Sequence, residues 1–115
     1  MAAVRYSSGW DLVRASAYSG GSARKRGVAG ASVTFTFTGR GVGLVTALAP
    51  TRGRVKVYVD GRYLQTLDLR SAVYRYRTIA SGRSWTSSAK HTVRLVVRGT
   101  PGRPRVDVDA FVVVR

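Results

Sequence analysis

Apolar and polar side chains alternate in short runs along this chain, and Gly, Ser, Pro and Asp-Gly sequences separate the runs. Residues 32–38 are the clearest case, because Val33, Phe35 and Phe37 alternate with threonines. Successive side chains of a strand point to opposite faces, so this run predicts a strand with one apolar face and one hydroxyl face. Helical periodicity is nearly absent, and the chain is therefore expected to be all-β.

The same pattern predicts the other strands, at residues 42–48, 54–60, 62–69, 72–80, 90–98 and 105–114. Between them, turns are expected at residues 39–41 and 99–104, and a loop that carries Trp85 at residues 81–90. No helix is expected. About eight or nine short strands at this spacing are typical of an antiparallel β-sandwich or jelly roll. Its expected core contains Val33, Phe35, Phe37, Val57, Leu64, Val93, Leu95 and Val97.

Asp60-Gly61 gives the strongest local signal in the chain. This dipeptide tolerates the positive φ angles of a two-residue type I′ hairpin turn. The turn is expected to pair Val57 with Leu64 on the core face. Leu67 has the opposite parity to Leu64, so a β-bulge near residues 65 and 66 is expected to restore the apolar face.

The other face of this hairpin is the candidate ligand site. The turn is expected to place Tyr58 opposite Tyr63 and Lys56 opposite Gln65, with Arg54 nearby. Sugar rings dock their C–H faces on tyrosine rings, while Arg and Gln supply planar hydrogen-bond donors. The alternative is that the two tyrosines form a purely structural cross-strand pair beside a solvated row of charges.

Length and composition indicate one folded unit, so residues 1–115 are expected to form a single β-sandwich module. The chain has no apolar run near the roughly 18 residues of a membrane span, and its first residues do not resemble a signal peptide. Cys is absent, which excludes disulfides and thiolate metal sites within the chain.

Charge is the unusual feature, because 20 Lys and Arg residues against 5 acidic residues leave a net charge of +15. Most of the basic residues are Arg, and Glu does not occur. A GC-rich genome accounts for Arg in place of Lys but not for the scarcity of acids. Both genome bias and a polyanionic partner therefore stay open.

The same scarcity argues against catalysis. Glycosidic hydrolysis uses two carboxyl groups that face each other across a cleft, and two of the five acids, Asp107 and Asp109, lie on one predicted strand. His91 is the only His, and no nucleophile-elbow motif accompanies it. The chain is therefore not expected to be an enzyme.

Several short motifs follow one another in an order that resembles a known family. They are Tyr18-Ser19-Gly20-Gly21, Gly30-Ala31-Ser32-Val33, Phe35-Thr36-Phe37-Thr38-Gly39, Arg52-Gly53, Val57-Tyr58-Val59-Asp60-Gly61, Leu67-Asp68-Leu69, His91-Thr92-Val93 and Val106-Asp107-Val108-Asp109-Ala110-Phe111. Together they resemble a galactose-binding-like jelly-roll domain over nearly the whole chain. They are similar in particular to the non-catalytic carbohydrate-binding modules of actinobacterial secreted and cell-surface proteins.

The resemblance implies a location outside the cell or at its surface. It also implies a structural calcium ion, which related domains hold with an early Glu and an Asp of the final strand. Asp109 matches that Asp, but the chain has no Glu, and Arg24-Lys25-Arg26 replaces a segment that is aromatic in the family. No other cofactor is expected, and Asp109 is the one metal-ligand candidate.

Three functions remain open. The first is binding of carbohydrate or of an anionic cell-surface polymer, which the resemblance and the charge both favour. The second is a structural or assembly role through self-association or docking on a partner protein. The third is nucleic-acid binding through the basic surface, for which no motif is present.

Overall fold

A computed structural model describes residues 3–115, and Met1 and Ala2 lie outside the described residues. Its strands are β1 (Ala3–Tyr6), β2 (Asp11–Arg14), β3 (Ser22–Arg26), β4 (Ser32–Leu48), β5 (Arg54–Val59), β6 (Arg62–Asp68), β7 (Arg75–Val97), β8 (Val106–Val108) and β9 (Ala110–Val114). One short 3-10 turn, η1 (Ser19–Gly21), occurs where no helical element was expected. Among residues 3–115 there is no helix with the length and apolarity that a membrane span requires.

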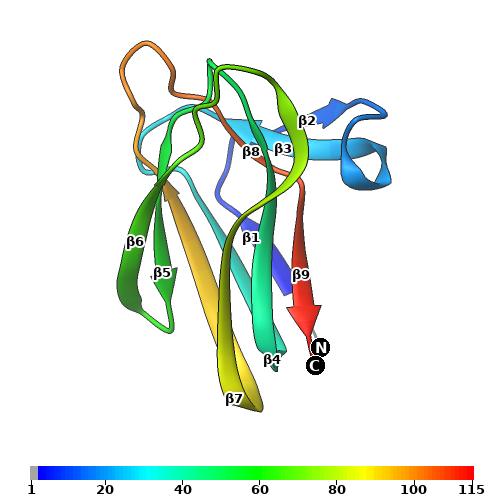
Figure 1. Ribbon diagram of the computed structural model, residues 1–115. Coiled ribbons are helices and arrows are strands. Elements are labelled where there is room, and N and C mark those ends of the chain that lie inside the picture. Colours follow the sequence, from blue (N-terminus) through cyan, green and yellow to red (C-terminus); the bar gives the residue numbers. More distant parts are fainter. Residues whose placement is uncertain (1–2) are drawn as a thin grey trace.

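Six strands form one sheet, in which β1, β4, β7, β5 and β6 are hydrogen-bonded in this order and β9 pairs with β4. The two long strands β4 and β7 both turn back at the lower end of the molecule (Figure 1). Their register shifts between Gly39 and Gly41. Before this shift β4 pairs with β1, and after it β4 pairs with β9. One sheet thus folds over into both layers of an antiparallel sandwich, which confirms the predicted fold class.

A smaller sheet of three strands, in the order β2, β3 and β8, lies toward the opposite end of the molecule (Figure 1). The predicted final strand at residues 105–114 is therefore wrong as a single element. It divides at Asp109 into β8, which pairs with β3, and β9, which pairs with β4. The chain changes sheets at this residue, and alternation along the sequence does not record such a change.

The two layers enclose an apolar core. Phe35 of β4 stacks on Phe111 of β9, with ring centroids 4.4 Å apart and planes 9° apart. Seven of the eight predicted core residues are buried, namely Val33, Phe35, Phe37, Val57, Val93, Leu95 and Val97. Trp10 is also buried in this core, and Trp85 packs partly against it.

Leu64 is the exception, because its side chain is 37% exposed. Asp60 and Gly61 have φ angles of 51° and 81°, which confirms the hairpin turn. Tyr58 pairs with Tyr63 as predicted, but Val57 pairs with Gln65, so Leu64 is the extra residue of the bulge. The predicted Val57–Leu64 and Lys56–Gln65 pairs are therefore wrong, and the bulge begins one residue earlier than expected. The bulge still returns the apolar residues that follow, such as Leu67, to the core face of the hairpin.

The bend of the long strands also differs from the prediction. Residues 39–41 do not end a strand, because β4 continues through them as it passes between the layers. Residues 81–90 are not a loop but part of β7, which remains paired with β4 on both sides of the bend. A strand that follows a corner keeps its hydrogen bonds, although its glycines and serines look like loop residues in the sequence.

Candidate functional site

The outer face of the hairpin carries the aromatic pair that the sequence predicted. Tyr58 of β5 and Tyr63 of β6 are cross-strand neighbours, with ring centroids 5.8 Å apart and planes at 68°. Tyr63 is 56% exposed, and its hydroxyl shares a 2.7 Å hydrogen bond with the Thr66 hydroxyl. Tyr63 therefore presents an aromatic surface to solvent, and the hydrogen bond to Thr66 fixes the orientation of its ring.

Only some of the polar residues predicted for this face are available there. Lys56 lies opposite Thr66 on the tyrosine face and is half-buried. Arg54 shares the face, but its Nε donates to Asp68 Oδ2 at 3.4 Å, so a carboxylate already partners its charge. Gln65 lies on the other side of the hairpin, where its Nε2 donates to the Ser81 hydroxyl of β7 at 2.8 Å. The bulge at Leu64 turned Gln65 away, and its predicted place beside Tyr58 is wrong.

A residue that the sequence analysis missed completes the face. Arg94 of β7 is directly opposite Tyr58, and Thr34 of β4 is directly opposite Arg94. Opposed residues of antiparallel strands share one face of a sheet, so these three side chains lie in a row. Thr34, Tyr58, Gly61, Thr92 and Arg94 line a groove of about 290 Å³. Thr92 and Arg94 alternate with the buried Val93 and Leu95 along β7, so they share its polar face. Only the pairing of β7 with β5 brings this face next to Tyr58.

A second group of tyrosines lies at the other end of the sandwich. The rings of Tyr74 and Tyr76 stack with centroids 6.2 Å apart, so the two side chains share a face. Tyr76 also makes an edge contact of 5.4 Å with the buried Tyr18, and Arg52 Cζ lies 5.8 Å from the centre of Tyr74. Tyr74 is 56% exposed, so this end offers a second aromatic surface.

A buried ionic cluster supports this second surface. Asp107 is fully buried and pairs with Arg52 at 2.8 Å and with Arg105 at 2.8 Å. The Tyr18 hydroxyl donates to Asp107 Oδ2 at 2.7 Å. Burial, together with this hydrogen bond, raises the pKa of Tyr18. Asp107 is therefore a structural acid, whose charge is partnered by two arginines.

Asp109 does not lie in a metal site built from side chains. Its Oδ2 accepts a hydrogen bond from the backbone N–H of Ser19 at 3.0 Å, while its buried Oδ1 has no partner among the described residues. Within residues 3–115, no three His, Cys, Asp or Glu side chains lie close enough together to hold an ion. Calcium takes six to eight oxygen ligands, which include backbone carbonyls and water, so a calcium ion at Asp109 stays a prediction.

Similar solved structures place this architecture among known folds. The CBM36-1 domain of a multidomain xylanase from the hindgut metagenome of Trinervitermes trinervoides matches 96% of this chain and 94% of its own length, with a TM-score of 0.54 and 12% identity. The chain has the fold of a carbohydrate-binding module. A Clostridium thermocellum family two carbohydrate esterase matches with a TM-score of 0.66 and 17% identity, and a Paenibacillus xanthan lyase with 0.67 and 14%.

The chain spans only 30% of that esterase chain and 12% of that lyase chain, so this carbohydrate-binding-module fold corresponds to one part of each. No protein-family model matches the sequence, and no curated protein matches it either. At identities this low the likeness concerns the fold alone. Function has to be argued from the side chains.

Proposed function

We propose that this protein is a non-catalytic module that binds a polysaccharide on the outer face of the β5–β6 hairpin, outside the cell or at its surface. The observation that carries the proposal is the pair of the half-buried Tyr58 and the exposed Tyr63, beside the groove that Arg94 and Thr34 line. An aromatic ring covers the C–H face of a sugar, and neighbouring guanidinium and hydroxyl groups bond to its hydroxyls. The fold shared with a carbohydrate-binding module supports the same reading.

The arrangement favours an extended ligand over a small one. The groove opens onto a sheet face, where Tyr63 and Arg94 are the cross-strand neighbours of Tyr58. Lys56 lies two residues from Tyr58 along β5 on the same face. A chain of sugars can run along such a row, whereas a single sugar contacts only part of it. The ligand class proposed is therefore a polysaccharide, with the +15 charge of the chain favouring an anionic one.

A glycan array followed by titration calorimetry tests the proposal. Tyr63→Ala removes a half-exposed ring without opening the core, so we expect a folded variant that loses about tenfold in affinity, as for an aromatic contact worth about 1.4 kcal/mol. Tyr63→Phe keeps the ring and loses only the hydroxyl, so it serves as the matched control and is expected to bind.

A third variant separates the two aromatic surfaces. Tyr74→Ala truncates an equally exposed ring at the other end of the sandwich and should leave binding unchanged. Loss of binding in Tyr74→Ala, with Tyr63→Ala intact, would move the site to that end. An array on which no glycan binds would contradict the proposed function and return attention to an assembly role.

A further inference from the structure

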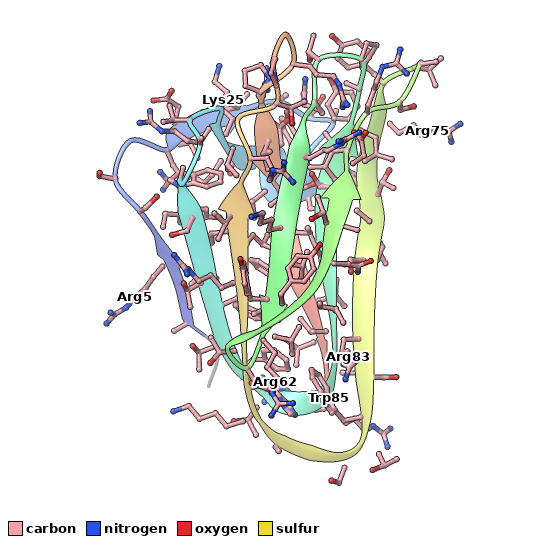
Figure 2. The ribbon with its side chains drawn as sticks, turned by 90° about the vertical axis from the view of Figure 1, so that its left-hand side faces the viewer. Arg5, Lys25, Arg62, Arg75, Arg83 and Trp85 are labelled. Carbon is pink, nitrogen blue, oxygen red and sulfur yellow. The ribbon has the colours of Figure 1, made fainter. Side chains whose placement is uncertain are left out.

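A second depression lies at the lower end of the sandwich, between the hairpin turn and the bend of β7. Its volume is about 360 Å³, and its lining includes Asp60, Arg62, Tyr63, Leu64, Arg83 and Trp85. Arg62, Arg83 and Trp85 gather at this end, while Arg5, Lys25 and Arg75 lie at other, separate places on the surface (Figure 2). Two exposed guanidinium groups and two aromatic rings thus converge on one concave site.

The two arginines of this depression form no direct ion pair. None of the ion pairs within residues 3–115 involves Arg62 or Arg83. Asp60 is the one acid in the lining, and it is already engaged by His91 Nδ1 at 2.7 Å and by the backbone N–H of Thr92 at 2.9 Å. Both guanidinium groups are therefore free to meet an anion from outside.

The pairing of Asp60 keeps this carboxylate charged without making the depression acidic. Partial burial by itself raises the pKa of Asp60, but the hydrogen bonds from His91 and Thr92 and the charge of Arg83 outweigh it, so the pKa is lowered. Asp60 thereby anchors the hairpin turn to β7. The charges of Arg62 and Arg83 outnumber the single negative charge of Asp60, so the net charge of the depression is positive.

Stacking holds the aromatic wall in place. Trp85 lies flat on His91, with ring centroids 3.6 Å apart and planes 8° apart. Arg83 Cζ lies 5.8 Å from the centre of the Trp85 ring, within cation–π distance, and both residues line the depression. A rigid wall loses little entropy when a ligand binds, which favours affinity.

We propose that this depression binds the anionic group, a carboxylate or sulfate, of a sugar residue in an acidic polysaccharide, with Arg62 and Arg83 as the ligands of the anion. The planar fork of Arg matches such groups with paired hydrogen bonds, which Lys does not offer. Tyr63 belongs both to the aromatic pair on the sheet face and to this depression, so one polymer can occupy both. The inference rests on the proposed function and names its substrate class.

A nucleic acid fits these observations less well. Its phosphates recur at every nucleotide and are met by a track of cations. The other basic residues labelled in Figure 2, Arg5, Lys25 and Arg75, lie apart from the depression and from one another. A single concave site with two guanidinium groups favours one acidic substituent on a sugar chain.

Matched pairs of glycans test the inference. The array carries uronate oligosaccharides beside their methyl esters and sulfated oligosaccharides beside their desulfated forms, and titration calorimetry at roughly 0.15 M and 0.5 M salt follows each hit. At the higher salt the Debye length is about 4 Å, so attraction by distant charges is largely screened. We expect the charged member of a pair to bind about tenfold more tightly, as for one charge-assisted hydrogen bond. Which pair shows the preference distinguishes carboxylate from sulfate.

Arg62→Gln and Arg83→Gln are expected to lose about tenfold in affinity for the charged member and to bind the neutral member as the parent does. Arg75→Gln removes the same charge from a distant exposed site and serves as the matched control (Figure 2). Circular dichroism of each variant confirms that it is folded.

Four outcomes would overturn the inference. Equal binding of charged and neutral members would leave the proposed function standing without this anion site. An equal loss in Arg75→Gln and Arg83→Gln would show diffuse attraction by net charge. Oligothymidylate that binds as tightly as the best acidic glycan, and loses binding in the same variants, would make the depression a nucleic-acid site. Failure of every glycan to bind would contradict the proposed function as well.

Discussion

Arg52 and Asp107 form a 2.8 Å ion pair in the interior of the protein, where their side chains are 2% and 0% exposed. Arg105 and the Tyr18 hydroxyl complete the shell of the carboxylate. The pair joins the segment before β5, a strand of the six-stranded sheet, to β8 of the three-stranded sheet. It lies directly beneath Tyr74, so it also supports the aromatic surface at that end.

Asp107→Asn is expected to destabilise the fold by about 3–5 kcal/mol, because it leaves the buried Arg52 charge uncompensated. Urea unfolding measures the loss. The matched comparison is Asp68→Asn at the exposed Arg54–Asp68 and Arg103–Asp68 pairs, which should cost no more than about 1 kcal/mol near neutral pH. Equal losses in the two variants would show that the Asp107 shell is not a desolvated ion pair.

Leu69→Ala and Leu64→Ala test the position of the bulge. Leu69 is fully buried, so its truncation is expected to cost about 2–5 kcal/mol. Leu64 is 37% exposed, so its truncation should cost about 1 kcal/mol or less. Unfolding midpoints in urea measure both. A larger loss at Leu64 than at Leu69 would mean that Leu64 faces the core as the sequence pattern predicted.

The loss of folding stability at low pH is expected to depend on the protonation of Asp68. The hydrogen bond from Arg103, and further bonds from the Arg70 backbone and Arg54, lower the pKa of Asp68 from 3.8 to about 2. In the unfolded chain this carboxyl takes up its proton at higher pH than in the folded protein. The stabilisation is therefore present above about pH 4 and is lost as the pH falls from 3.8 to about 2.

Thermal unfolding between pH 2 and 5 measures this effect. In Asp68→Asn the melting temperature should fall less steeply as the pH is lowered, because the variant has no carboxyl to protonate at this position. Asp11→Asn serves as the control at an exposed acid outside all the ion pairs described. A decline as steep in Asp68→Asn as in the parent would place the acid sensitivity at other carboxyls.

The sequence by itself determined the fold class, most of the core and the hairpin turn. Alternation of apolar residues is a local property, and it identified the buried faces of β4, β5 and β7 directly. Asp60 and Gly61 are likewise a local signal, because the turn depends on the positive φ angles that these two residues tolerate. The Tyr58–Tyr63 pair followed from the turn, since a two-residue loop sets the first cross-strand partners.

The tertiary structure alone decided how these elements combine into surfaces. The bulge at Leu64 turned Gln65 away from Tyr58, because one extra residue inverts the side-chain phase of the strand that follows. Arg94 joined Tyr58 because β7 lies beside β5, a neighbour relationship between segments distant in sequence. Arg62, Arg83 and Trp85 converge only because β7 bends at the end of the sandwich where the hairpin turn also lies. Local patterns record which way a side chain faces, whereas long-range packing decides what it faces.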